Sequence, residues 1–175
     1  NAMGKRAATG FKCGVCGQWH DHLMTDIACR LPDDVFALPY IERYQRARFN
    51  DDLCTLDGKR YFIRGILPVP FTYIDDFFAW GVWVEVAKKD HDAYASRFGQ
   101  SSGAGRTFTG VLANKLAGYR STLGQHVTVE TVSDERPTVR LAPASRHALA
   151  LEQRRGIDAE RHHEMVAPHM ERERQ

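Results

Sequence analysis

The sequence predicts an α+β domain: a mainly antiparallel sheet with flanking helices and a zinc knuckle near the amino terminus. One apolar run, Phe77–Val86, is rich in aromatic and β-branched residues, which favours a strand. Two pairs of shorter segments alternate apolar and polar residues around turn-forming residues, which is typical of hairpins. Two closely spaced cysteines followed by a histidine indicate the metal site.

The strands are expected mainly as antiparallel neighbours. Residues 53–56 and 61–67 flank Asp57-Gly58, a dipeptide typical of two-residue hairpin turns. Pro68 and Pro70 are expected to end the second strand, because proline has no N–H to donate to a neighbouring strand. Phe77–Val86 is almost continuously apolar, which predicts a central position in the sheet. Further strands are expected at residues 108–112, 127–129 and 139–141, the last two forming a hairpin around the turn at 133–137.

Helices are expected to begin near Asp33 and to cover residues 40–48, 88–98, 145–154 and 158–165. Asp33 or Asp34 and Asp158 are the expected N-caps, since a side-chain carboxylate there accepts from otherwise unpaired backbone N–H groups. Gly156 is expected between the last two helices. His162 and His163 are interpreted as exposed helix residues.

The domain boundaries follow from composition. Residues 1–10 are expected to be a tag and mobile lead, in which Asn1-Ala2 before Met3 is typical of a cloning remnant. Residues 11–170 are expected to form a single α+β domain with the zinc knuckle at 11–22, and residues 171–175 a frayed tail.

The charge and hydropathy of the chain exclude several classes of function. The net charge is +2, from 24 basic and 22 acidic residues that interleave, so nucleic acid is not a favoured partner. No apolar run reaches the roughly 20 residues needed to cross a bilayer, and no signal peptide is expected. We therefore expect a cytoplasmic protein, in which four cysteines favour metal binding or free thiols over disulfides.

Cys13 and Cys16, each followed by glycine, have the spacing that lets two thiolates converge on one zinc ion about 2.3 Å from each sulfur. His20 or His22 can supply a third ligand. A redox motif is the alternative interpretation of this cysteine pair, but such motifs usually open a helix in a βαβ unit.

The fourth ligand has two candidates among the remaining thiols, Cys29 and Cys54. Either is equally well interpreted as a small buried core residue. Cys54 lies on an expected strand that can bring it beside the knuckle.

Three carboxylates, Asp51, Asp52 and Asp57, surround the first hairpin, with Arg64 on its second strand. Such carboxylates can bind hard metal ions or act as general bases, although they more often solvate turns and pair with arginine. His163-Glu164 begins a zinc-protease motif, but Ala167 stands where the second histidine is needed. The glycines around residues 103–105 lack the remainder of a phosphate-binding loop.

The chain resembles DUF2199, a bacterial family of unknown function. The residues that carry the resemblance are Cys13-x-x-Cys16-Gly17-x-x-His20, Asp52-x-Cys54-x-Leu56-Asp57, Phe62-Ile63-Arg64-Gly65 with Pro68 and Pro70, Trp80-Gly81-Val82-Trp83, Gly110-x-Leu112-Ala113-Asn114-x-Leu116, Tyr119-x-x-Thr122-Leu123, Arg136-Pro137 and His147-x-Leu149-Ala150-x-Glu152-Gln153-x-x-Gly156-Ile157. The resemblance implies a Cys₃His site of Cys13, Cys16, His20 and Cys54, and it implies no reaction.

Two functional hypotheses follow. The first is a binding or regulatory protein with a structural zinc site, whose partner is an unidentified protein or small-molecule ligand. The alternative is a metal-dependent hydrolase that uses an open zinc site or the acidic cluster near Asp52 and Asp57. No membrane is expected as a partner.

Overall fold

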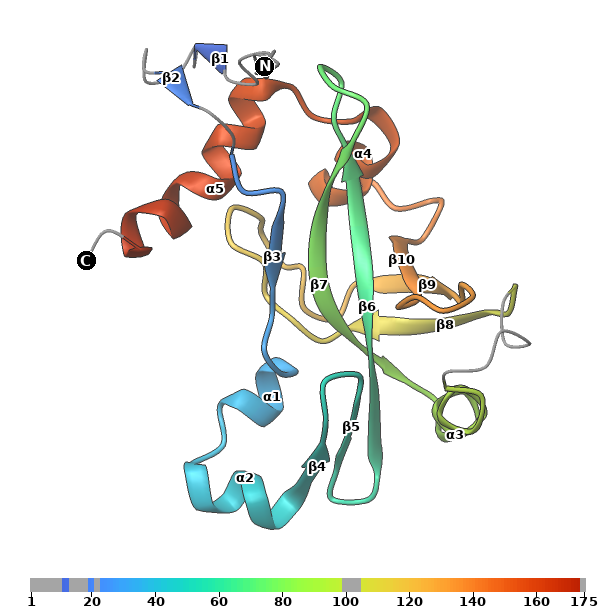
Figure 1. Ribbon diagram of the computed structural model, residues 1–175. Coiled ribbons are helices and arrows are strands. Elements are labelled where there is room, and N and C mark those ends of the chain that lie inside the picture. The colour runs from blue at the N-terminus through green and yellow to red at the C-terminus, as the bar shows by residue number, and fades with distance from the viewer. Residues whose placement is uncertain (1–10, 13–18, 21–22, 99–104, 174–175) are drawn as a thin grey trace, which may run out of the picture.

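The computed structural model describes residues 11–12, 19–20, 23–98 and 105–173 (Figure 1). The strands are β1 (Phe11–Lys12), β2 (Trp19–His20), β3 (Asp26–Ala28), β4 (Ala47–Phe49), β5 (Leu53–Leu56), β6 (Arg60–Pro70), β7 (Phe77–Val86), β8 (Thr107–Leu112), β9 (His126–Glu130) and β10 (Thr138–Leu141). The helices are α1 (Asp33–Phe36), α2 (Tyr40–Arg46), α3 (Lys88–Ser96), α4 (Ala148–Arg155) and α5 (Ala159–Glu173).

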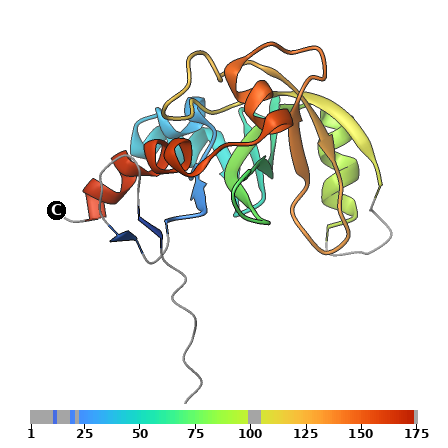
Figure 2. The same cartoon turned by 90° about the horizontal axis from the view of Figure 1, so that it is seen from above.

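Five strands close into a small barrel. Antiparallel pairing joins β6 to β7, β7 to β8, β8 to β9 and β9 to β10, and β10 returns to β6 in parallel. The hairpin β4–β5 extends the sheet beyond β6, and β3 pairs in parallel with β7. Figure 2 shows α5 on one flank of the barrel and α3 on the opposite flank. The predicted α+β class with a mainly antiparallel sheet is confirmed, whereas the knuckle segment lies largely outside the described residues.

The barrel interior is the main hydrophobic core. Alternate residues of β7 point into it, because successive side chains of a strand face opposite sides of the sheet. Trp80 and Phe78 are the largest of these, and they meet edge to face with ring centroids 5.1 Å apart. The prediction that Phe77–Val86 lies centrally in the sheet is confirmed, since β7 pairs along its length with β6.

A second core covers the outer face of the sheet. Trp83 of β7 and Cys54 of β5 pack here with Val35 of α1. Asn114, which is fully buried, secures this layer: its Oδ1 accepts from the backbone N–H of Trp83 at 2.7 Å, and its Nδ2 donates to the Leu31 carbonyl at 2.9 Å.

Asp33, an expected N-cap, is instead the first residue of α1. Its carboxylate accepts from Asn114 Nδ2 at 3.0 Å and from the backbone N–H of Lys115 at 2.8 Å, and the position before the helix is occupied by Pro32. The prediction for Asp158 is confirmed, because its Oδ1 accepts from the backbone N–H of Arg161 at 2.8 Å at the start of α5. Asp33 therefore binds residues distant in the sequence, whereas Asp158 caps its own helix.

The prediction for Pro68 is wrong, because β6 continues past it. Pro70 is the last residue of the strand, as predicted, and pairs there with Phe77. The carbonyls of both prolines accept from outside the β6–β7 pair, from Gln153 Nε2 and from the backbone N–H of Ile157. The two ring nitrogens therefore also face away from β7, and their missing N–H groups cost no hydrogen bond with it.

His162 is buried rather than exposed, with 1% of its surface accessible. Its Nε2–H donates to the carbonyl of Met24 at 2.7 Å, and its Nδ1 accepts from the Tyr73 hydroxyl at 2.7 Å. The ring also stacks on Phe71, with centroids 4.4 Å apart. Burial lowers the pKa of His162, so the neutral imidazole fastens α5 to the segment before β3.

Candidate ligand-binding site

The residues of the predicted zinc site are only partly described. Cys13, Cys16 and His22 lie outside the described residues, and His20 is described only as backbone in β2. Within the described segments, no three His, Cys, Asp or Glu side chains lie close enough together to hold a metal ion. The zinc site therefore stays a prediction.

Cys54 is a core residue of the second hydrophobic layer, with 1% of its surface accessible. Burial raises the pKa of its thiol to about 12, which favours the neutral thiol. Cys29 is partly exposed, and burial raises the pKa of its thiol to about 11. A metal ion would have to displace the proton of either thiol, since zinc binds the thiolate.

The prediction of an acidic cluster near Asp52 and Asp57 is wrong, because these residues lie at opposite ends of β5. The carboxylate of Asp57 accepts hydrogen bonds from Nε and Nη2 of Arg46, at 2.9 and 2.8 Å. The positive φ angles of Asp57 and Gly58 confirm the predicted hairpin turn. Asp52 pairs instead with Arg136. Since both carboxylates are held by arginine, neither is presented as a general base.

The pair of Asp52 and Arg136 is the centre of the candidate site. Nε of Arg136 donates to Oδ1 of Asp52 at 2.9 Å across 84 residues of sequence. Within the described residues, neither terminal nitrogen of Arg136 has a hydrogen-bond or ion-pair partner. The carboxylate thus orients the guanidinium through Nε and leaves its forked end available to an anion.

Arg64 adds a second positive charge beside this pair. Its Nη1 donates to the Asp51 carbonyl at 3.3 Å, and its guanidinium lies over the ring of Trp83, 6.0 Å from the centroid. Its Nε is buried, with no hydrogen-bond partner in the described part of the chain. Burial, and next the charge of Arg136, lower the pKa of Arg64. The positive charge at this point is only partly compensated by Asp52 and Asp51.

One side of Arg136 opens into a cavity of about 320 Å³ between α3 and the barrel, here called the α3 pocket. Tyr94 of α3, Phe98, which follows the helix, and Phe108 of β8 provide its aromatic wall. Burial raises the pKa of Tyr94 to about 12, with Asp52 adding to the effect, so the phenol stays a neutral donor.

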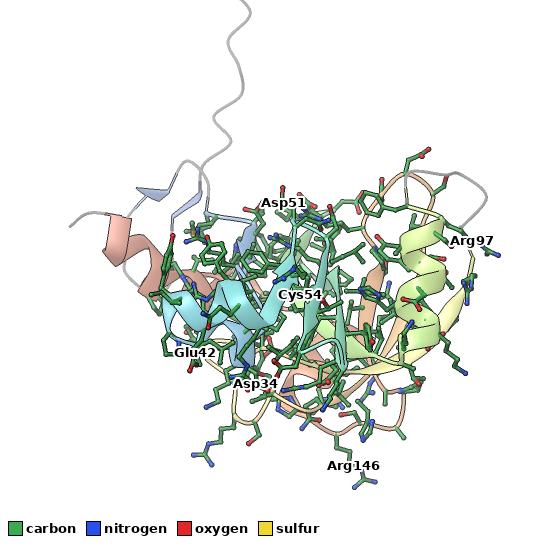
Figure 3. All side chains as sticks on the ribbon, turned by 90° about the horizontal axis from the view of Figure 1, so that it is seen from below. Asp34, Glu42, Asp51, Cys54, Arg97 and Arg146 are labelled. Atoms are coloured by element: carbon green, nitrogen blue, oxygen red, sulfur yellow. The ribbon has the colours of Figure 1, made fainter. Side chains whose placement is uncertain are left out.

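Two further arginines line the α3 pocket, Arg97 after α3 and Arg106 before β8. Figure 3 shows Arg97 at the edge of α3. In the described structure, neither side chain has a hydrogen-bond or ion-pair partner. Asp134 and Glu135 also line the pocket, but they are exposed. The pocket therefore combines aromatic surface with arginines whose side chains have no partner in the described part of the chain.

The other side of Arg136 faces an open groove of about 680 Å³ between β6 and β10, here called the β6–β10 groove. Its apolar lining comes from Ile66, Pro68, Pro70 and Phe77. Glu135 and Arg136 line both the groove and the α3 pocket, so the two hollows share one wall.

A model of the family "Uncharacterized protein conserved in bacteria (DUF2199)" matches residues 12–157. The chain belongs to the DUF2199 family. No curated protein and no solved structure matches it. None of the described helices of this DUF2199 protein is long and apolar enough to cross a membrane.

Several residues that carry the DUF2199 resemblance meet at the candidate site, namely Asp52, Arg64, Arg136 and Gln153. Sequence reasoning considered Asp52 and Arg64 only as neighbours of the hairpin and did not connect them with Arg136. The presence of these charged residues inside the family motifs is a sequence signal for a functional role. Their spacing along the chain does not indicate that they lie close together.

Proposed function

We propose that this DUF2199 protein binds a small organic anion in the α3 pocket, with Arg136 as the anchor for the negative charge. The observation that carries the proposal is the guanidinium of Arg136. Asp52 holds it through Nε, its two terminal nitrogens have no hydrogen-bond or ion-pair partner among the described residues, and the residue lines the pocket. A pre-oriented guanidinium recognises carboxylate or phosphate oxygens with two parallel hydrogen bonds.

The size and lining of the pocket support the same proposal. About 320 Å³ is at the lower end of the range typical of small-molecule sites, which are mostly apolar with a few polar groups for orientation. Tyr94 and Phe108 line the pocket and supply aromatic surface to a planar ligand, while Arg97 and Arg106 add attraction for negative charge. A binding or regulatory protein fits this arrangement better than a hydrolase, since Asp52 is engaged by Arg136.

The test is isothermal titration calorimetry with benzoate, phenyl phosphate and, as the uncharged analogue, benzyl alcohol. We expect the two anions to bind more tightly than the alcohol, and Arg136→Gln to abolish that preference. Arg146→Gln is the matched control, because Arg146 is exposed and points away from the site (Figure 3). Equal binding of benzoate and benzyl alcohol, or no binding of either anion, would contradict the proposal.

We further propose that zinc is a structural component, bound by Cys13, Cys16 and His20 with Cys54 as the fourth ligand. Because Cys54 is buried among apolar side chains, Cys54→Ser will destabilise the fold with or without a metal. Cys13→Ser and Cys16→Ser are therefore the informative variants. Elemental analysis should find one zinc per chain in the parent and none in either variant; a zinc-free parent would contradict the proposal.

A further inference from the structure

The β6–β10 groove begins at Arg136 and leads away from it. β10 runs parallel to β6, and Thr138 is in register with Ile66. The parallel direction places Arg136 beside the Arg64 end of β6 and places Arg140 nearer Pro68. A ligand whose charged group sits on Arg136 thus has a direct path along Ile66 and Pro68 toward Pro70 and Phe77.

The floor of this groove has few backbone groups left for a ligand. Gln153 of α4 reaches across the gap between the strands: its Nε2 donates to the carbonyls of Pro68 and Val139 at 3.0 and 3.2 Å, and its Oε1 accepts from the backbone N–H of Leu141 at 2.9 Å. The backbone N–H of Ile66 donates to the Pro137 carbonyl at 2.8 Å.

The two prolines contribute no N–H at all, and the carbonyl of Pro70 accepts from the backbone N–H of Ile157 at 2.8 Å. An extended peptide bound along a sheet edge gains affinity from main-chain hydrogen bonds. Here the donors and acceptors that such a peptide would need are already paired or missing, so its own amides would be desolvated without compensation. A hydrocarbon chain has no such requirement.

The side chains of the groove suit a hydrocarbon chain. Ile66, Pro68 and Pro70 are partly exposed along the groove, and Phe77, with 46% of its surface accessible, stands near its far end. Covering this apolar surface with alkyl groups removes both from water, which is favourable in proportion to the area buried.

We propose that the β6–β10 groove binds the aliphatic tail of an amphiphilic anion whose charged head is held by Arg136. The inference rests on the proposed function in one respect, the role of Arg136 as anion anchor, and it extends that function by naming the ligand class. The α3 pocket and the groove are then two arms of one site, which meet at the wall formed by Glu135 and Arg136.

The experiment is calorimetric titration of the full chain with sodium butanoate, hexanoate, octanoate and decanoate below their micelle concentrations, with benzoate in parallel. Each added CH₂ that enters the groove should lower the dissociation constant by about fourfold. The heat-capacity change of binding should become more negative with chain length. Octanol, which lacks the charge, should bind at least tenfold more weakly than octanoate.

Variants separate the tail site from the head site. Phe77→Ala removes an exposed side chain at the far end of the groove, so it should leave butanoate and benzoate unchanged and weaken decanoate several-fold. Arg136→Gln should weaken every anion of the series, whereas Arg146→Gln, the exposed control, should weaken none.

The outcomes are distinct. Benzoate binding without any gain from chain length overturns the tail site and leaves the proposed function standing, whereas failure of all the anions overturns both. A chain-length gain that survives in Phe77→Ala, or tight binding of alkanoates to Arg136→Gln, places the ligand elsewhere and overturns the inference. Tighter binding by an acetylated apolar tripeptide with a free C-terminal carboxylate than by decanoate would favour a peptide and also overturn it.

Discussion

Two arginines on the outer face of the barrel contrast sharply in how they are paired. Arg60 donates through Nε and Nη2 to both oxygens of Glu85, each at 2.8 Å, and Nη2 also pairs with Asp34 at 2.8 Å. Among the residues that the structure describes, Arg136 pairs only through Nε, with a single oxygen of Asp52. Internal partners use Nε and Nη2 of Arg60, whereas Arg136, which lines a pocket and a groove, uses only Nε among the described residues.

The contrast extends to the surroundings of each pair. The Arg60 side, with α1, Asn114 and Trp83, is knitted together by buried hydrogen bonds and faces a cavity of only about 140 Å³. The Arg136 side borders both larger hollows. The ion pairs of Arg60 thus stabilise the fold, whereas the ion pair of Arg136 orients a positive charge at the two hollows. The two roles differ in how many guanidinium N–H donors have an internal partner.

The largest expected effect is a loss of stability on the Arg60 side of the barrel. Asn114→Ala leaves the buried backbone N–H of Trp83 and the carbonyl of Leu31 without partners, so the free energy of unfolding should fall by about 3 kcal/mol. Urea denaturation followed by tryptophan fluorescence measures this loss. Benzoate affinity of the folded variant should be unchanged. A decrease in the free energy of unfolding smaller than about 1 kcal/mol would show that the hydrogen bonds of Asn114 do not stabilise this layer.

Arg136→Gln should change stability little and weaken benzoate binding strongly. Because only one hydrogen bond to a partly exposed carboxylate is lost, the free energy of unfolding should change by about 0.5 kcal/mol or less. Loss of a charged donor pair should weaken benzoate binding roughly thirtyfold, equivalent to about 2 kcal/mol. Calorimetry and urea denaturation of the same preparation give both quantities, and a variant that loses stability but keeps affinity would reverse the assignment.

Acidification should weaken the fold without acting on the arginine pairs directly. The pKa of His162 is lowered in the folded state, so the unfolded state binds more protons as pH falls below about 6.5. The contribution of this residue is therefore present above that pH and is lost toward lower pH, at up to about 1.4 kcal/mol per pH unit.

Urea denaturation at a series of pH values from 7.5 to 5.5 measures this dependence. His162→Gln can replace the ring as a neutral donor and acceptor, so the variant should be less stable than the parent at pH 7.5 but show a smaller decline on acidification. A parent and variant with the same pH dependence would exclude His162 as the group responsible.

The smallest effect is expected for Arg60→Gln. The salt bridges of Arg60 are partly exposed, so their loss should lower the free energy of unfolding by about 1 kcal/mol. Benzoate affinity should stay within twofold of the parent. A greater loss of affinity in this variant than in Arg136→Gln would contradict the division of roles between the two arginines.

Features that depend on neighbouring residues could be predicted from the sequence. Asp57-Gly58 makes a hairpin turn because both residues adopt positive φ, and the β-branched and aromatic run of Phe77–Val86 forms a strand wherever it packs. The helical pattern of residues 88–98 predicted α3, although the helix itself ends at Ser96. The motifs also identified the family.

Contacts between residues far apart in the sequence could not be predicted, because they depend on how the barrel closes. Asp52 and Arg136 are 84 residues apart, and they meet because β10 closes the barrel onto β6. His162 has the helical neighbours of an exposed residue, but the segment before β3 covers it. Local sequence cannot encode such encounters, because they depend on the register and closure of strands far apart in the chain.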